Sequence, residues 1–182
     1  AQHTQRMRVV QVLASSYSLG YQPGDVVVLG MPMFHTAGSL ICGLYAMLSG
    51  ARVILLHANG FRDAKVIANF WKLVDKFNIS VLMGVPTVFS ALLNTPLEGA
   101  NISSLRSVIT GGSPVPQELQ KAFYAMTGIE VAQGFGMTEV GGMCSIQMSP
   151  TSENRGSAGI RMPFLEIKIA KDITHEKITL EA

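Results

Sequence analysis

Five short apolar segments recur along the chain at nearly constant spacing. They begin at residues 25, 52, 79, 105 and 129, so consecutive starts lie 27, 27, 26 and 24 residues apart. Continuous apolar segments of strand length are typical of β-strands that are covered on both faces. Strands that alternate with helical patterns predict βαβ units around a mostly parallel sheet. The expected fold is therefore α/β, with three layers in the order αβα. The predicted strands cover 25–30, 52–56, 79–83, 105–109 and 129–132.

Helical periodicity fills the remaining parts of the first 130 residues. Asp63 is suited to cap one helix, and Pro116 and Gly128 are suited to open and close another. Apolar residues at helical spacing predict helices over 1–20, 37–48, 66–77 and 116–128.

The pattern changes after Gly136. Residues 141–159 are rich in Gly, Ser and Thr and predict a loop that contains one short strand near 143–147. The alternation over 164–170 predicts a further strand, paired with 177–180. Charged residues of the loop, such as Arg155, are expected to be solvated. A short β segment therefore follows the αβα part.

Composition excludes several classes of protein. Hydrophobic residues make up 48% of the 182 residues, which argues against disorder. The net charge is +2 with no stripe of Lys and Arg, so no nucleic-acid partner is expected. Cys42 and Cys144 form neither a disulfide framework nor a zinc pattern, which favours a reducing, cytoplasmic location. The longest apolar stretch, 37–48, is shorter than the roughly 20 residues of a membrane span, and no secretory signal is recognisable.

Candidate binding residues follow the predicted strands. Ligands of open parallel sheets bind beyond the carboxyl ends of the strands, where this chain has five loops: 31–35, 57–60, 84–86, 110–113 and 133–139. His35 lies just past the first strand, and a lone histidine is either structural or part of a site.

Two of these loops have unusual compositions. Gly111, Gly112 and Ser113 follow a strand and precede a helix, so they either admit a flat ligand to the main chain or form a tight turn. The second loop, 133–139, is neither a dinucleotide fingerprint nor a Walker loop. Its Thr138 could donate to an oxyanion and its Glu139 could hold Mg²⁺. The alternative is a capping carboxylate beside a core aromatic residue.

Four motifs give the chain a resemblance to a known family. Pro32-Met-Phe-His35, Gly111-Gly-Ser-Pro114, Gly134-Phe-Gly-Met-Thr-Glu139 and Gly156-Ser-Ala-Gly159 occur in this order across about 130 residues, with Pro116 and Pro163 beside two of them. In this order they resemble the adenylate-forming (AMP-binding) superfamily of acyl-CoA synthetases, luciferases and peptide-synthetase adenylation domains. Phe34-His35 is most similar to the acyl-CoA synthetase branch.

The resemblance implies an internal fragment of the family's large N-terminal domain. Residues 1–140 would be an αβα subdomain, and 141–182 would be a glycine-rich loop and the start of a β-barrel-like portion. The family's phosphate loop, ribose-binding aspartate and C-terminal domain with its catalytic lysine are not recognised, and Asp172 lacks the context of that aspartate. Residues 1–182 alone are therefore expected to be inactive as a ligase.

The resemblance also implies roles for individual residues. Thr138 would contact the α-phosphate, Glu139 would bind Mg²⁺, and His35 would lie near the reacting carboxylate and the thiol channel. Phe135, where the family usually has Tyr, would stack on adenine. The residues implied for ATP or AMP are Gly111, Gly112, Ser113, Gln133, Gly134, Phe135, Gly136, Met137 and Thr138, and those implied for the acyl and CoA channel are His35, Gly84, Val85 and Pro86.

The leading functional hypothesis is an ATP-dependent carboxylic acid–CoA ligase that forms an acyl-adenylate. Its substrates would be ATP, CoA and a small-molecule carboxylate, with a fatty or other apolar acid favoured. Three alternatives remain open at this point: an adenylation domain that loads a carrier protein, a nucleotide-binding or scaffold protein without catalysis, and a plain α/β domain whose glycine loops are turns.

Overall fold

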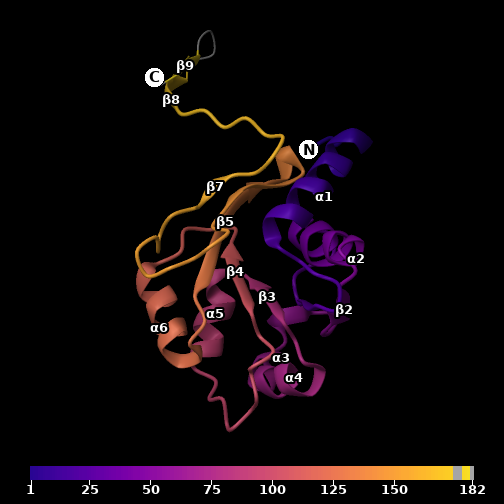
Figure 1. Cartoon of the computed structure of the whole chain (residues 1–182), viewed down its shortest axis with the longest axis vertical. Coiled ribbons are helices and arrows are strands. Elements are labelled where there is room, and N and C mark those ends of the chain that lie inside the picture. Colours follow the sequence, from indigo (N-terminus) through magenta and orange to yellow (C-terminus); the bar gives the residue numbers. More distant parts are fainter. Residues whose placement is uncertain (174–177, 181–182) are drawn as a thin grey trace.

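A seven-stranded sheet forms the centre of the molecule, in the order β2-β1-β3-β4-β5-β6-β7 (Figure 1). The structure is a computed structural model, and it describes residues 1–173 and 178–180. Neighbouring strands run parallel from β2 to β5, whereas β6 and β7 are antiparallel. The mostly parallel α/β sheet is thereby confirmed. The strands are β1 (Val26–Leu29), β2 (Arg52–Leu55), β3 (Val81–Gly84), β4 (Ser107–Gly111), β5 (Val131–Met137), β6 (Gly142–Ile146) and β7 (Ile160–Arg161).

Helices cover both faces of the sheet. Along β1, Val26 and Val28 pack into one apolar core, while Val27 and Leu29 pack into the other, because successive strand residues point to opposite faces. Figure 1 shows α1 and α2 on one side of the sheet and α5 and α6 on the other. One layer holds α1 (Gln5–Leu19), the π-helical segment η1 (Ala37–Tyr45) and α2 (Ala46–Leu48). The other holds η2 (Gly60–Arg62), α3 (Ala64–Ala68), α4 (Phe70–Phe77), α5 (Pro86–Leu93) and α6 (Gln117–Thr127).

The helix ends follow the signals in the sequence. The Asp63 carboxylate accepts a hydrogen bond from Lys65 N at 2.8 Å, as an N-cap does. Pro116 precedes α6, and Gly128 closes it in the left-handed conformation, at a φ of 74°. Thr4 caps α1 in the same manner as Asp63 caps α3, by accepting from Met7 N.

Two helical predictions need correction. The helix predicted over 66–77 is broken at Asn69, which separates α3 from α4 and turns its side-chain amide back to the Lys65 carbonyl oxygen at 2.9 Å. Helix α5 was not predicted, although Pro86 stands in its first turn, where proline is tolerated.

One loop prediction and one strand prediction were also wrong in part. The loop expected at 133–139 is strand as far as Met137, because β6 lies antiparallel to β5 and pairs with its backbone. Strand β2 is not covered on both faces: it is the edge of the sheet, and Leu55 is 68% exposed.

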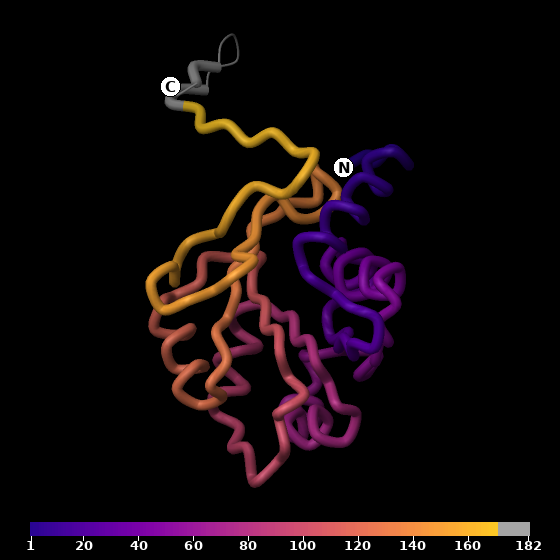
Figure 2. The backbone as a smooth tube through the Cα atoms, viewed as in Figure 1, coloured from indigo at the N-terminus to yellow at the C-terminus, as the bar shows by residue number. Residues whose placement is uncertain are grey.

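The C-terminal part differs from expectation at two places. The short strand near 143–147 is confirmed as β6, but 164–169 contain no strand. The chain there leaves the sheet as an extended segment (Figure 2), and β8 (Ala170–Ile173) pairs with β9 (Ile178–Leu180). Lys177, at the start of the predicted partner strand, lies outside the described residues. The β-barrel-like character of 141–182 stays a prediction.

Arg155 is not solvated, contrary to expectation. Its side chain is 12% exposed and forms a bidentate ion pair with Glu130, and its guanidinium lies 5.3 Å from the centre of the Tyr124 ring. The long loop is thereby tied to the start of β5. Among the described helices, none has the length and apolarity needed to cross a membrane.

A buried carboxylate joins the amino ends of three strands. Asp25 accepts from Gln22 N and Ser80 Oγ, each at 2.7 Å, and from Arg106 Nε at 2.8 Å. Burial raises the pKa of this carboxyl, but the hydrogen bonds from Arg106 and Ser80 outweigh burial and hold its pKa below the usual value. This cluster lies at the opposite end of the strands from their carboxyl ends.

Candidate active site

A cavity of about 200 Å³ opens at the carboxyl ends of the central strands. After β1 the chain crosses to β2 through η1 and α2 on one face, and after β3 it crosses to β4 through α5 on the other. The loops after β1 and β3 therefore diverge, which leaves a crevice at this switch point. Residues from the ends of β1, β3, β4 and β5 line this space, called the central cavity below.

Two strands meet closely at one wall of the central cavity. A Cβ added to Gly111 would lie 2.4 Å from the Gly134 carbonyl oxygen of the neighbouring strand. No side chain fits there, and the backbones of β4 and β5 are bare toward the cavity. Gly112 follows at a φ of 82°, a left-handed conformation that glycine adopts without strain.

The glycine-rich segment of β5 contributes backbone and one hydroxyl. Gly134, Gly136, Met137 and Thr138 line the central cavity. The pairing of β5 with β6 shifts register after Phe135, as in a β-bulge. The segment ends in the short 3₁₀ turn η3 (Thr138–Val140), none of whose side chains is buried.

Glu139 lies in η3 with an exposed carboxylate. Within residues 1–173 and 178–180, no ion pair engages it. The same residues contain no group of three or more His, Cys, Asp or Glu side chains arranged to bind a metal. A cation at Glu139 would thus be held by one carboxylate together with oxygens of a ligand, which is how Mg²⁺ is usually bound beside nucleotide phosphates.

The His35 ring has a fixed orientation. Its Nδ1 accepts a hydrogen bond from Ala37 N at 3.1 Å, and its backbone NH donates to the Pro32 carbonyl oxygen. With Nδ1 as acceptor, the neutral ring carries its proton on Nε2. His35 lines the central cavity, so this nitrogen is a potential donor to a ligand.

A second space, the outer hollow, lies on the other side of the loop after β1. It measures about 540 Å³, and its walls come from η2, α3, α5 and the loop that includes Phe34. Four residues line both spaces, so the two are neighbours across them: Met31, His35, Val85 and Gly112.

The structure brings most of the predicted site residues to the central cavity and leaves five outside its lining. Phe135 is 46% exposed beside it, and Ser113 and Glu139 are exposed. Gln133 is half-buried, and its side-chain oxygen is buried without a hydrogen-bond partner among the described residues. Pro86 is buried at the start of α5. The predicted residues that line the cavity are His35, Gly84, Val85, Gly111, Gly112, Gly134, Gly136, Met137 and Thr138.

Other lining residues had not been singled out from the sequence. Thr110 is 1% exposed, and its hydroxyl lacks a partner among the described residues. Its place at the carboxyl end of a strand is the signal that could have drawn attention to it. The remaining ones are Met31, Thr36, Ala37, Ile41, Met83, Ile109, Gly142 and Met143, most of them apolar.

Comparison with known protein families identifies the family of this chain. The sequence model described as AMP-binding enzyme matches residues 1–179. The chain belongs to the AMP-binding enzyme family. Among curated members of related sequence, a marinolic acid–CoA ligase of Pseudoalteromonas sp. is 36% identical over 143 residues, which cover 79% of this chain and 22% of that protein. A long-chain-fatty-acid–CoA ligase of Escherichia coli is 28% identical over 177 residues, 96% of this chain and 30% of that protein.

Solved structures agree with this membership at the level of the fold. An anthranilate–CoA ligase, AuaEII, in complex with anthranoyl-AMP superimposes with a TM-score of 0.83 at 21% identity, over 99% of this chain and 34% of that one. The present chain spans less than a third of the length of the curated AMP-binding relatives named above.

Proposed function

We propose that the whole protein activates a carboxylic acid with ATP and transfers the acyl group to the thiol of coenzyme A. The observation that carries the proposal is the central cavity, where bare backbone from β4 and β5 faces His35 and Thr138. Membership of the AMP-binding enzyme family supports an acyl-adenylate intermediate. The names of the two related ligases support coenzyme A as the acceptor.

In this proposal the nucleotide base binds at the carboxyl ends of β4 and β5. The Gly111–Gly112 backbone admits a flat ring, with Ser113 beside it, and the exposed face of Phe135 stacks on the other side. Gln133 precedes Gly134 on β5 and is proposed to lie near the base, although its side-chain oxygen is buried and the residue does not line the cavity. Gly134, Gly136 and Met137 contribute backbone to the same wall.

The phosphates belong near η3. The Thr138 hydroxyl donates to an α-phosphate oxygen, and the Glu139 carboxylate, exposed and without an ion pair in the described part of the chain, would hold Mg²⁺. When bound, Mg²⁺ supplies neutralisation of the charge on the phosphates. Orienting the α-phosphate is the task of Thr138.

Two displacements complete the reaction. A carboxylate oxygen of the acid forms a bond to the α-phosphorus while the bond to pyrophosphate breaks, which gives the acyl-adenylate. The thiolate of coenzyme A then forms a bond to the acyl carbon, and AMP leaves with the oxygen. His35 lines the cavity and, when neutral, carries its proton on Nε2, so it can donate to the acyl oxygen on which charge develops.

The acid of this reaction is proposed to be apolar, such as a fatty acid. Ile41, Met83 and Ile109 give the central cavity apolar walls. Gly84 ends β3, Val85 lines both this cavity and the outer hollow, and Pro86 begins α5. This arrangement suits a thiol that approaches from the hollow side. A cytoplasmic location is part of the proposal, supported by Cys42 and Cys144, which are both unpaired and buried.

The test is ATP–pyrophosphate exchange by the whole protein with short, medium, long and aryl carboxylates, with formation of the CoA thioester measured in parallel. Exchange together with thioester is the expected result, and it identifies the class of acid. Exchange without a CoA thioester would favour loading of a carrier protein. No exchange with any acid would favour a nucleotide-binding protein without catalysis.

Replacement of Glu139 tests the role of the carboxylate. Glu139→Gln is expected to lower exchange by ~10²-fold, the usual effect of losing an electrostatic group at a transition state. Glu118→Gln is the matched control, because Glu118 lies on the exposed face of α6 and, among the residues that the structure describes, pairs with Lys121 alone. Near wild-type exchange in Glu139→Gln would contradict the metal role.

A further inference from the structure

The turn that carries Thr138 and Glu139 has little packing of its own. The side chains from Phe135 to Glu139 are exposed, and η3 buries none of its side chains. Within the turn, Gly141 N donates to the Thr138 carbonyl oxygen at 2.9 Å. The place of this turn relative to the cavity therefore depends on what packs behind it.

One face of α1 lies behind the turn. His3, Met7 and Gln11 are spaced four residues apart, so they fall on the same side of a helix and its entry. His3 Nε2 is within hydrogen-bond distance of the Thr138 carbonyl oxygen. A Cβ on Gly141 would lie 3.4 Å from Gln11 Cγ and 3.5 Å from Met7 Cγ, so both side chains abut the backbone there.

Gln11 links this helix to the strand that follows the turn. Its side chain is 1% exposed, and its amide nitrogen donates to the Met143 carbonyl oxygen at 3.1 Å. Met143 and its neighbour Gly142 line the central cavity, whereas Gln11 does not. Gln11 thus holds β6 from the side that faces away from a ligand.

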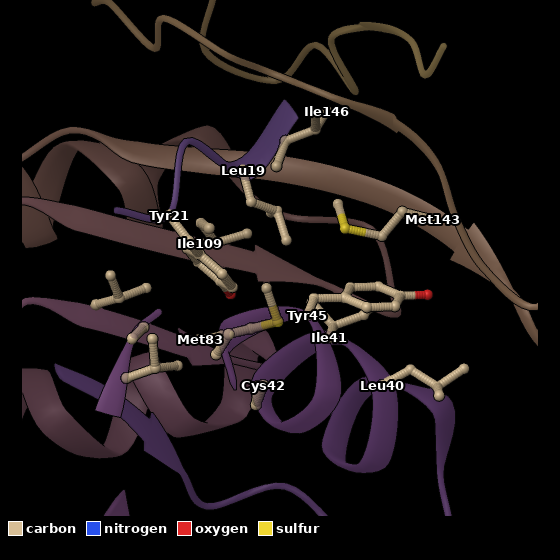
Figure 3. Close-up of a cluster of buried hydrophobic side chains, with 14 of the residues drawn as sticks. Leu19, Tyr21, Leu40, Ile41, Cys42, Tyr45, Met83, Ile109, Met143 and Ile146 are labelled. Atoms are coloured by element: carbon tan, nitrogen blue, oxygen red, sulfur yellow. The ribbon is translucent and has the colours of Figure 1, made fainter. Parts of the chain in front are cut away.

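Tyr45 of η1 also packs against the start of β6. Its side chain is fully buried, and its ring lies beside Met143 in Figure 3. A Cβ on Gly142 would lie 3.1 Å from the Tyr45 hydroxyl oxygen. Burial raises the pKa of this phenol to about 12, so the hydroxyl stays protonated at neutral pH.

Packing alone does not explain these two polar side chains. The side-chain oxygen of Gln11 has no hydrogen-bond partner among the described residues, and an unpaired buried polar atom is destabilising. The buried hydroxyl of Tyr45 has the Ser15 side chain beside it. Methionine would fill the volume of Gln11 without the cost of an unpaired oxygen. What glutamine adds is the hydrogen bond to β6.

We infer that Gln11, with Tyr45, is a positioning residue that fixes the β5–β6 turn so that Thr138 and Glu139 face the nucleotide phosphates. The inference rests on the proposed function for what the turn binds. It goes beyond that function by assigning a task to α1, a helix whose residues do not line the central cavity.

The test compares two buried glutamines in the whole protein. Gln11→Met is expected to change the thermal midpoint little, because loss of the hydrogen bond to the Met143 carbonyl oxygen is offset by removal of a buried oxygen without a partner among the described residues. It should increase amide hydrogen exchange in 138–143. The rate of adenylation should fall about 10-fold, because loss of a residue that orients a metal ligand typically costs 10–100-fold. The Mg²⁺ concentration that gives half-maximal ATP–pyrophosphate exchange should rise to match.

Gln120→Met is the matched control. Gln120 is also 1% exposed and donates to a strand carbonyl, that of Val131 at 2.9 Å, but its oxygen is paired with Gly156 N at 3.0 Å. Its replacement should lower the thermal midpoint while hydrogen exchange in 138–143 and the Mg²⁺ dependence stay as in the wild type. Tyr45→Phe should change hydrogen exchange in 138–143, adenylation and the Mg²⁺ dependence in the same direction as Gln11→Met does.

The outcomes separate this inference from the proposed function. Hydrogen exchange in 138–143 that is unchanged in Gln11→Met overturns the inference, whatever the activity. Faster exchange there, with a shifted Mg²⁺ dependence and a thermal midpoint that changes little, supports it. A wild-type protein without ATP–pyrophosphate exchange for any acid would overturn the proposed function, while the hydrogen-exchange comparison would still decide whether Gln11 holds the turn.

Discussion

Removing the Asp25 carboxylate should destabilise the protein without affecting its site. The Asp25 side chain is 6% exposed and accepts hydrogen bonds from Gln22, Ser80 and, twice, Arg106. Breaking a buried ion pair on one side costs about 3–5 kcal/mol. Because Arg106 is 39% exposed and regains water, Asp25→Ala should lie at the lower end, near ~3 kcal/mol.

Urea unfolding at pH 7 measures this loss. Trp71 is the only tryptophan in the 182 residues and is 1% exposed in the core beside the sheet, so its fluorescence reports on this part of the protein. With a urea dependence of about 2 kcal/mol per M, the midpoint should fall by about 1.5 M. The KM for ATP should not change, because Asp25 lies at the amino ends of the strands and the cavity lies at their carboxyl ends.

The contribution of Asp25 should also depend on pH. Its folded-state pKa is held below the unfolded value, so its stabilisation is complete above the unfolded pKa of about 3.9. It is lost as the pH falls from there through the folded pKa. The difference between wild type and Asp25→Ala should therefore shrink below about pH 4. A difference under about 1 kcal/mol at pH 7, or one that persists on acidification, would refute this reasoning.

Two further predictions follow from close contacts and burial. Gly111→Ala places a Cβ 2.4 Å from the Gly134 carbonyl oxygen and should reduce ATP–pyrophosphate exchange at least about 10-fold, because β4 and β5 must separate beside the cavity. Gly112→Ala strains the backbone, because Gly112 has a φ of 82°, but its Cβ would lie 3.6 Å from Val85 Cγ1, an ordinary contact, so exchange should fall less. The reverse order would contradict the proposed wall. Burial raises the pKa of the Cys42 thiol to about 12, so alkylating reagents followed by mass spectrometry should label Cys42 only after unfolding, and rapid labelling of the native protein would show that its burial is wrong.

The strands were predictable because their signal is local. A continuous apolar run such as 26–29 is buried on both faces wherever helices cover the sheet, and it needs no distant partner to be recognised. Helix α5 was missed for a related reason. Its segment, Pro86–Leu93, is short and mostly apolar, so it lacks the polar face that distinguishes a helix from a strand.

Features that depend on distant partners were not predictable. The strand β5 continues through two glycines, which disfavour strands locally, because β6 supplies an antiparallel partner. The Arg155 side chain is largely shielded from solvent because it pairs with Glu130, a residue 25 positions away. In the candidate site the glycine motifs were found from their order, whereas Met143 carries no local signal and reaches the cavity only because β6 pairs with β5.

The pairing of β5 restricts how a site of this kind can move. Gly134 is hydrogen-bonded into the ladder on both sides, and the residues as far as Met137 remain paired with β6. A segment held in this way cannot swing open as a lid does, because the ladder bonds would have to break. Motions that admit and release substrates must therefore arise in segments outside the ladder, such as the loop after β1 and η1. Under the proposed function, substitutions that change the preferred acid can accumulate in the loop after β1 and in η1 during evolution, while the backbone of β4 and β5 beside the nucleotide stays in place.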